Sequence, residues 1–330
     1  MGDVAMSVPV IRVLVSQHPD LKITIATRGF FAPFFRGIKN VEVYEVDLKT
    51  KYKGFFGLYK LYKELKTLGF DVVADIHNVL RTIILKFFFA GKKVVQIDKG
   101  RAEKKALISG QKFEQLKTTH QRYADVFAKL GFPVDLASSV FPDKVELKSE
   151  LNTFISNSSL PIIGIAPFAA FEGKMYPLDQ MKLVIKALSK NHNIILFGGG
   201  KTEVEQLNLV ESEFDNTKSV AGKLTLNEEL DIISNLDVML SMDSGNAHIA
   251  AMLGIKVVTI WGVTHPFAGF TPFNQPKDYA LLADRKQYPE IPTSIYGNKQ
   301  PEGYENAARS VSAESVVSKI KTIISNSEAV

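Results

Sequence analysis

The sequence predicts an α/β protein of two doubly wound, parallel-sheet domains, at residues 1–150 and 151–330. Three observations lead to this fold class. The length of 330 residues exceeds one comfortable core and fits two domains of about 150 residues. Helix-like and strand-like segments alternate through the first half, which is typical of a parallel sheet flanked by helices. After a polar stretch, the same alternation starts again in the second half.

The first half contains six segments with a clear apolar pattern. In chain order they are a helix at 8–19, strands at 22–28 and 41–46, a helix at 57–69, a strand at 71–77, and a helix at 119–133 that Gly131 and Pro133 close. The chain opens on a Gly-Asp turn and a helix, although a doubly wound domain normally enters such a turn from its first strand. Either the domain lacks that strand or the chain has lost it.

The second half follows a polar stretch from about 138 to 159, which we interpret as the domain junction. Its segments are a strand at 161–167, a helix at 178–190, a strand at 193–200, a helix at 201–213, a helical segment at 227–235, and a strand–helix–strand unit at 237–262. The last helix, at about 311–326, is a candidate for packing back on the N-terminal domain.

Composition excludes several classes of protein. Hydrophobic residues make up 45% and charged residues 23%, as in folded globular proteins, and no run of about 18 apolar residues could span a bilayer. Because the chain has no cysteine, disulfides, thiolate metal sites and cysteine nucleophiles are excluded. The N-terminus has no signal-peptide pattern, so we expect a cytoplasmic location. A net charge of +5 and a pI near 9.0 favour contact with anions.

The strongest candidate site is the stretch "SMDSGNAHIAAMLGIKVVTIWG" at 241–262. Between two apolar strands, at the start of a short helix that Gly254 ends, it gathers Asp243, Ser244, Gly245, Asn246 and His248. Ligands of open α/β sheets bind beyond the carboxyl ends of the strands, where a helix N-terminus offers N–H groups to a phosphate. The alternative is that Asp243 or Ser244 merely caps the helix and His248 packs under the sheet. Both interpretations remain open.

Two further loops of the second half are candidates for the same ligand. Lys174 is the one fixed positive charge in the loop 166–177, and either it meets a phosphate or it is simply solvated. Three glycines at 198–200 lie between a strand and a helix, but they match neither G-x-G-x-x-G nor the P-loop pattern. We interpret Gly199 as part of a close-approach turn, with Glu203 as an acceptor for a ribose hydroxyl.

The first half offers a different set of candidates. Asp3, on the opening turn, could act as a general base for a substrate hydroxyl, or it could be a helix N-cap. His77 and Arg81 follow a strand and could bind an acidic acceptor, although a polar strand end is the commoner explanation. Arg101 is a third candidate for acceptor binding.

Aromatic and basic residues interleave at 28–39, 51–66 and 86–93. One set has helical spacing and is therefore expected on the core face of a helix: Phe55, Leu58, Tyr59, Tyr62 and Leu65. Basic residues beside exposed Phe also suit docking on an anionic membrane surface. Core packing and membrane contact both remain open.

Several motifs are absent. There is no D-x-D pair, no H-x-x-x-H and no G-x-S-x-G, and the six histidines are scattered singly. We therefore expect no bound metal, no cofactor and no hydrolase triad.

Four motifs in order resemble the family 9 glycosyltransferases, the lipopolysaccharide heptosyltransferases. They are "MGDVAMSVP", the K-x-x-P of "GKMYP", "FGGGKTE" and "DSGNAHIAAMLGIKVVTIWG", and together they span nearly the whole chain. The resemblance implies a GT-B fold, in which two Rossmann-like domains face a central cleft. It also implies inverting transfer of heptose from ADP-heptose to a lipid-linked core oligosaccharide, peripheral contact with the inner membrane from the cytoplasm, and no nucleic acid.

The resemblance also assigns roles to individual residues. Asp3 matches the family's general base, Lys174 matches the lysine on the donor phosphates, and the donor-binding element matches Asp243, Ser244, Gly245 and His248. The chain departs from the family at Ala169 and Ala170, where hydroxyl residues are common before the lysine. This departure leaves open a different sugar. A sugar-nucleotide epimerase and a two-lobed protein that binds a small ligand also remain open. The missing G-x-G-x-x-G disfavours a nicotinamide-dependent dehydrogenase.

Overall fold

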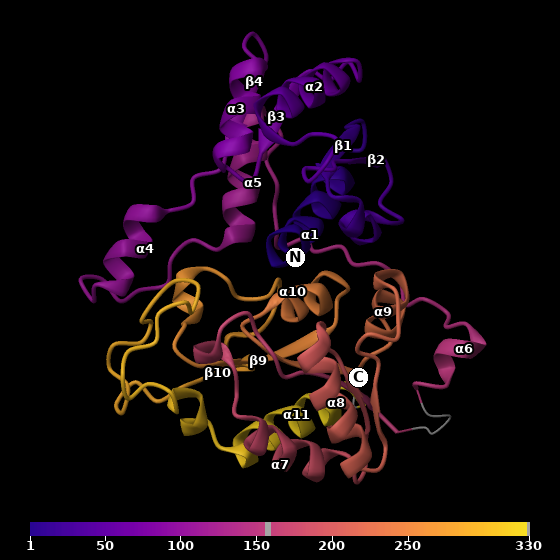
Figure 1. The fold of residues 1–330 in the computed structure, drawn as a ribbon, viewed down its shortest axis with the longest axis vertical. Helices are drawn as coiled ribbons and strands as arrows, with labels where there is room; N and C mark the ends of the chain where they lie inside the picture. Colours follow the sequence, from indigo (N-terminus) through magenta and orange to yellow (C-terminus); the bar gives the residue numbers. More distant parts are fainter. Residues whose placement is uncertain (156–159, 329–330) are drawn as a thin grey trace. The chain divides into compact units, whose positions relative to one another are not determined.

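The computed structural model describes residues 1–155 and 160–328. The chain divides into two compact units (Figure 1). Unit 1 comprises Met1, Asp3–Arg101 and Lys117–Phe141, and unit 2 comprises Gly2, Ala102–Leu116 and the described residues from Pro142 onward. Both units are α/β, with parallel pairing between all paired strands.

Unit 2 is built on a six-stranded parallel sheet in the order β10-β9-β8-β5-β6-β7. The strands are β5 Ile162–Ala166, β6 Asn193–Leu196, β7 Thr217–Ser219, β8 Val238–Met242, β9 Lys256–Trp261 and β10 Ala280–Leu282. The helices are α4 Arg101–Ile108, α6 Ser149–Asn152, α7 Leu178–Leu188, α8 Lys201–Glu213, α9 Leu226–Ile233, α10 Gly245–Met252 and α11 Ala313–Glu328. Short 3-10 turns are η2 Glu172–Lys174, η3 Pro266–Ala268, η4 Lys277–Tyr279 and η5 Ala307–Ser310.

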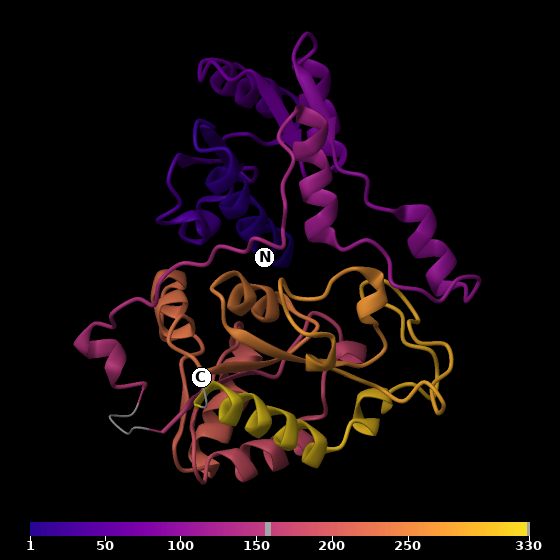
Figure 2. The same ribbon diagram turned by 180° about the vertical axis from the view of Figure 1, so that it is seen from behind.

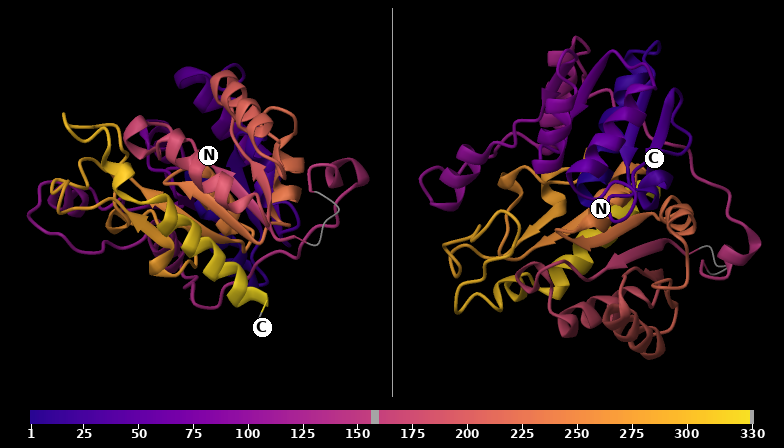
Figure 3. Two further views of the ribbon diagram at one scale, coloured as in Figure 1. Left: turned by 90° about the horizontal axis from the view of Figure 1, so that it is seen from below. Right: turned by 45° about the horizontal axis from the view of Figure 1, so that its top comes forward.

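The central strands of this sheet are apolar because both faces are covered. Every residue of β8 is buried, and β8 lies between β5 and β9. Helix α11 packs against α7, β8 and β9, and therefore lies on the sheet of unit 2 (Figure 3). Its buried face includes Val316, Ile320 and Ile323. Burial of each such side chain contributes about 1.5–3 kcal/mol.

One segment from the first half of the sequence belongs to unit 2. Residues 102–116 pack through Leu107 and Leu116 against Ala268 and Ile295. The backbone N–H of Leu116 donates to the carbonyl of Phe267 at 2.9 Å. The first half of the chain therefore contributes to the core of both units.

Unit 1 contains four strands in two separate parallel pairs, β1-β2 and β3-β4. The strands are β1 Ile23–Thr27, β2 Val41–Glu45, β3 Val72–Asp75 and β4 Lys93–Gln96. The helices are α1 Gly2–Gln17, α2 Gly54–Lys66, α3 Leu80–Phe88 and α5 Thr119–Leu130, with the 3-10 turn η1 Gly29–Phe35. Gly2 and Asp3, predicted as a turn before the first helix, lie within α1.

The sequence predicts a doubly wound domain without its first strand, and in unit 1 the two strand pairs are not joined to each other. In that topology the first strand lies at the centre, between the two halves of the sheet. Without it, β1 and β3 have no common neighbour to pair through, and the two halves remain separate sheets.

Local signals place the boundaries of α5 where the sequence predicts them, whereas α1 and α2 begin earlier than predicted. Helix α5 begins after Thr118, whose hydroxyl accepts the N–H of Gln121 at 3.2 Å, and ends at Gly131 with φ +107°. Across the residues that the structure describes, no helix is both long and apolar enough to cross a bilayer.

Candidate functional site

The predicted strand–turn–helix unit around Asp243 is confirmed. Strand β8 ends at Met242, Ser244 is the N-cap of α10, and the helix begins at Gly245. Asp243 therefore lies at the carboxyl end of a central, fully buried strand, which is where open α/β sheets bind ligands.

Three loops that follow neighbouring strands meet at the carboxylate of Asp243. Lys174 Nζ, from the loop after β5, lies 2.9 Å from Asp243 Oδ2. Thr264 Oγ1, from the loop after β9, donates to the same oxygen at 2.9 Å. The side chains of Lys174 and Asp243 are only 14% and 7% exposed. The alternative that Lys174 is simply a solvated loop lysine is therefore wrong.

Close backbone packing holds Lys174 in place. Gly297 has φ +76°, and a Cβ there would lie 2.4 Å from Lys174 Cγ, so only glycine lets that loop approach the lysine stem. The carbonyl of Gly173 accepts the N–H of Val263 at 2.8 Å. A Cβ at Gly262 would lie 2.2 Å from the same carbonyl oxygen. The ammonium group is thus fixed before any ligand arrives.

The start of α10 presents its N–H groups at the same place. Ser244 makes no side-chain cap, and its hydroxyl instead hydrogen-bonds the hydroxyl of Ser241 at 3.1 Å. Ser244 is thus the N-cap residue by position, but its hydroxyl does not cap the helix. The first-turn amides, which include those of Gly245 and Asn246, give the helix a partial positive end beside the loop of Lys174. The arrangement suits a diphosphate.

His248 is buried on α10, and its Nδ1 has no hydrogen-bond partner among the described residues. Burial, and after it the positive charge of Lys174, lowers the pKa of His248 to about 3. The ring is therefore neutral at physiological pH.

This lowered pKa predicts an acid-dependent loss of stability. The unfolded chain binds a proton at His248 below about pH 6.5, whereas the folded chain does not, so stability is lost as the pH falls. We expect this one residue to lower the free energy of unfolding by about 1–2 kcal/mol between pH 6.5 and 5. Urea unfolding of wild type and His248→Gln at both pH values checks this. Equal pH dependence in the two proteins would show that His248 accepts a proton in the folded state.

The glycine-rich turn after β6 is organised by its own carboxylate. Glu203 Oε2 accepts the N–H of Gly199 at 2.7 Å. Gly200, the N-cap of α8, has φ +88°, and a Cβ at Gly199 would point into open space. The turn is accessible, and the role of Glu203 toward a ribose hydroxyl stays a prediction.

In unit 1, Asp3 is exposed in the first turn of α1. The N-cap of this helix is Met1, so the interpretation of Asp3 as the cap is wrong. The carbonyl of Asp3 accepts the hydroxyl of Tyr123 at 3.3 Å. This bond ties the turn to α5 and leaves the carboxylate exposed.

His77 lies close enough to Asp3 and to Arg81 for the charges of both to act on its ring. Partial burial lowers the pKa of His77, the charge of Asp3 raises it, and Lys99 and Arg81 lower it. Arg81 is exposed in the first turn of α3, and Arg101 is exposed at the start of α4. The role of His77, Arg81 and Arg101 toward an acidic acceptor stays a prediction.

Sequence reasoning missed two residues that build these sites. Asp75, buried at the end of β3, accepts the N–H groups of His77 and Asn78 at 3.0 and 2.8 Å through Oδ1. Its Oδ2 accepts from Gln96 at 2.9 Å. Thr264 is the other residue, and its only signal is its place after an apolar strand. Asp75 had a usable signal, since an Asp at a strand end often forms an Asx turn.

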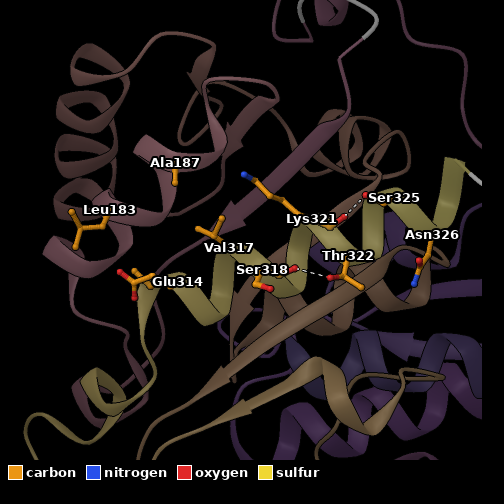
Figure 4. Close-up of a pocket in the computed structure, with 10 residues that line it drawn as sticks. Leu183, Ala187, Glu314, Val317, Ser318, Lys321, Thr322, Ser325 and Asn326 are labelled. Carbon is orange, nitrogen blue, oxygen red and sulfur yellow. Dashed lines mark hydrogen bonds between the residues drawn. The ribbon is translucent and has the colours of Figure 1, made fainter.

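Other candidate sites are less favourable. Within residues 1–155 and 160–328, no group of three or more His, Asp or Glu side chains is placed to hold a metal ion. A groove runs between α7 and α11 (Figure 4), lined by Leu183, Ala187, Val317, Lys321, Thr322 and others. The hydroxyls of Thr322 and Ser325 in this groove donate to carbonyls of α11. None of the predicted site residues lines it.

Comparisons with known proteins agree with this geometry. The family model described as glycosyltransferase family 9 (heptosyltransferase) matches residues 58–299. Lipooligosaccharide heptosyltransferase 2 of Haemophilus influenzae is 26% identical over 289 residues, which cover 81% of this chain and 82% of that protein.

Two solved structures are similar over almost the full length. The family 9 glycosyl transferase from Veillonella parvula has a TM-score of 0.74 at 19% identity, with 98% of this chain and 94% of that chain covered. E. coli ADP-heptose lps heptosyltransferase II has a TM-score of 0.68 at 19% identity, with 99% and 96% covered. These similarities show the fold, which is of the GT-B type.

Proposed function

The chain belongs to glycosyltransferase family 9, the heptosyltransferases, and on that premise we propose that it transfers heptose from ADP-heptose to the core of a lipid-linked oligosaccharide acceptor. The observation that carries this proposal is the buried cluster of Lys174, Asp243 and Thr264 beside the N-terminus of α10. A fixed ammonium group next to free helix amides is a site for a diphosphate.

On the donor side, the ammonium of Lys174 has three protons to donate. One direction is taken by Asp243, which orients the group, and the others are available to phosphate oxygens. As the bond between heptose and the diphosphate breaks, negative charge grows on ADP. Lys174 and the amides of α10 stabilise that charge, and this lowers the barrier.

On the acceptor side, Asp3 is the general base. The acceptor hydroxyl attacks the anomeric carbon from the face opposite ADP, its proton passes to the carboxylate of Asp3, and ADP leaves with the bonding electron pair. One C–O bond forms and one breaks. Because the attack comes from the face opposite ADP, the configuration inverts, and no covalent intermediate with the enzyme is needed. His77, Arg81 and Arg101 bind acidic groups of the acceptor.

A lipid-linked acceptor places this reaction at a membrane surface. We therefore include peripheral contact with the inner membrane from the cytoplasm in the proposal. The Haemophilus influenzae relative is named a lipooligosaccharide heptosyltransferase, which supports an acceptor of this kind.

Nucleotide selectivity tests the donor assignment. At 100 times its dissociation constant, ADP is expected to stabilise the protein by about 2.7 kcal/mol, which raises the melting temperature by a few degrees. UDP, GDP and NAD at the same concentration should have little effect. A preference for UDP or GDP would retain the glycosyltransferase and change the sugar, whereas a response to NAD alone would overturn the donor site.

Transfer is then measured directly. With ADP-heptose and an acceptor core that lacks heptose, the product should gain the mass of one heptose, with one ADP released per transfer. Conversion of the nucleotide sugar without an acceptor would indicate an epimerase instead.

A further inference from the structure

Unit 1 exposes large apolar side chains on two adjacent helices, α2 and α3. Phe56 is 85% exposed and Phe87 is 77% exposed, and Phe55, Leu80 and Ile83 are also exposed. The core face of α2 is formed instead by Leu58, Leu61 and Leu65. The prediction that Phe55 and Tyr59 lie on the core face is therefore wrong, although it is right for Leu58 and Leu65.

These side chains form one continuous surface. Ring contacts join Phe87 to Phe88 at 6.2 Å, Phe88 to Phe55 at 5.4 Å, and Phe55 to Phe56 at 5.9 Å between centroids. Leu80, Ile83 and Phe87 are spaced so that they share one side of α3. Helices α2 and α3 lie against each other in unit 1 (Figure 2). We call this set the α2–α3 aromatic surface: Phe55, Phe56, Leu80, Ile83 and Phe87.

The chain around this surface is strongly basic. Residues 51–93 contain nine Lys or Arg and three Asp or Glu, a net charge of +6 in a chain whose total is +5. Two of the three acids are already engaged. Glu64 pairs with Lys51 at 2.8 Å, and buried Asp75 accepts hydrogen bonds from its own turn. Exposed cations on the two helices include Lys60, Lys63, Arg81 and Lys86.

We propose that the α2–α3 aromatic surface docks on an anionic phospholipid bilayer. The Phe rings enter the boundary between headgroups and acyl chains, and the surrounding Lys and Arg side chains meet the lipid phosphates. This inference rests on the proposed function, because a lipid-linked acceptor is what brings the enzyme to a membrane.

Charge complementarity selects this partner over a second copy of the chain. A dimer through the surface would place two basic regions against each other, at a cost of several kcal/mol for juxtaposed like charges. An anionic bilayer neutralises the same charges. The surface is also next to residues proposed to bind the acceptor. Leu80 belongs to the surface, Arg81 follows it in α3, and the turn that carries His77 directly precedes this helix.

The test is co-flotation of the full chain with vesicles, either of phosphatidylcholine alone or of phosphatidylcholine and phosphatidylglycerol in equal parts. We expect binding only to the anionic vesicles, and weaker binding as salt rises. The double variant Phe56→Ser and Phe87→Ser should bind about tenfold or more weakly. The control is Leu209→Ser on α8 of unit 2, which removes a side chain that is 63% exposed and should change nothing.

Activity separates this inference from the proposed function. The double variant should retain wild-type transfer to a deacylated, soluble core acceptor and lose transfer to the same core in vesicles. If wild type transfers to the soluble acceptor but does not bind vesicles, or if the control loses as much binding as the double variant, the docking surface is refuted and the enzyme is not. If vesicle binding behaves as expected without transfer to either acceptor, the proposed function fails and the docking surface stands.

Two further results complete the test. Sedimentation velocity that shows a wild-type dimer and a monomeric double variant would assign the surface to a contact between copies and overturn the lipid proposal. If the double variant does not fold, Lys60→Gln with Lys63→Gln replaces it, since both are exposed. This variant should reduce binding to anionic vesicles, and unchanged binding would count against the proposal.

Discussion

Asp3→Asn is expected to lower kcat by a factor of about 10²–10⁴ and to leave the affinity for ADP unchanged. The substitution keeps the size of the side chain and removes its ability to take a proton from the acceptor hydroxyl. Because Asp3 is exposed in the first turn of α1, the loss of its charge should cost only about 0.3–1 kcal/mol of stability. Initial rates with ADP-heptose and a soluble acceptor give kcat, and calorimetric titration gives the ADP affinity.

A matched control is Asp20→Asn, which removes another exposed carboxylate of unit 1 outside any helix or strand. It should leave both kcat and ADP binding at wild-type values. Turnover of Asp3→Asn within a factor of a few of wild type would remove Asp3 from the role of base. A parallel loss of ADP binding would instead assign it to the donor.

Lys174→Met is expected to have the second large effect, on donor binding and on stability together. The ammonium lies 2.9 Å from buried Asp243, and removal of one partner of a buried pair costs about 3–5 kcal/mol because a buried charge is left unpaired. The lost contact with the diphosphate should weaken ADP binding by about 1–3 kcal/mol. Thermal unfolding and calorimetric titration measure the two effects separately.

A second substitution distinguishes the two roles of this lysine. In Lys174→Met with Asp243→Asn, no buried charge remains, and the amide oxygen can still accept from Thr264. Stability should return most of the way to wild type, whereas ADP binding should stay weak. If the double variant recovers ADP binding as well, Lys174 acts only by neutralising Asp243 and does not touch the donor.

The donor half of the protein could be predicted in detail from the sequence because its signals are local. Strands β5, β6, β8 and β9 are mostly apolar runs followed closely by Gly, Pro or Asp, so their carboxyl ends can be located, whereas the polar β7 and the short β10 were not predicted. Parallel pairing then brings the loop of Lys174 and the loop of Asp243 to one edge of the sheet. The sequence analysis predicted no contact between Lys174 and Asp243, and the structure adds the ion pair between them.

The features that the sequence did not reveal depend on distant contacts. Residues 102–116 belong to unit 2 because the rings of Phe113 and Phe267 pack at 4.8 Å and Arg285 lies over Phe113 at 3.6 Å. No local pattern says which unit such a segment will join. The same holds for Thr264, whose hydroxyl has a role only because Asp243 is beside it.

Helical spacing also could not show which apolar residues of α2 are buried and which are exposed. Phe55 and Leu58 both fit one apolar stripe, yet only Leu58 is buried. The stripe is wider than the face that the rest of unit 1 covers: Phe88 of α3, a helix that the sequence did not predict, contacts Phe55 and Tyr59, yet both remain exposed. Periodicity shows that a helix has an apolar side, and neighbouring elements decide how much of that side is covered.

The two separate strand pairs of unit 1 bear on how the two units resist unfolding. A two-stranded sheet has little cooperativity of its own, because each strand can lose its neighbour without disturbing others. In the six-stranded sheet, most strands are held on both sides and open together. The amides of β1 and β3 should therefore exchange with solvent deuterium through small local openings, whereas those of β5 and β8 should exchange only on global unfolding of unit 2. Asp3 and His77 then belong to the unit that opens more easily. If the acceptor orders this unit when it binds, the cost of that ordering reduces the free energy of acceptor binding.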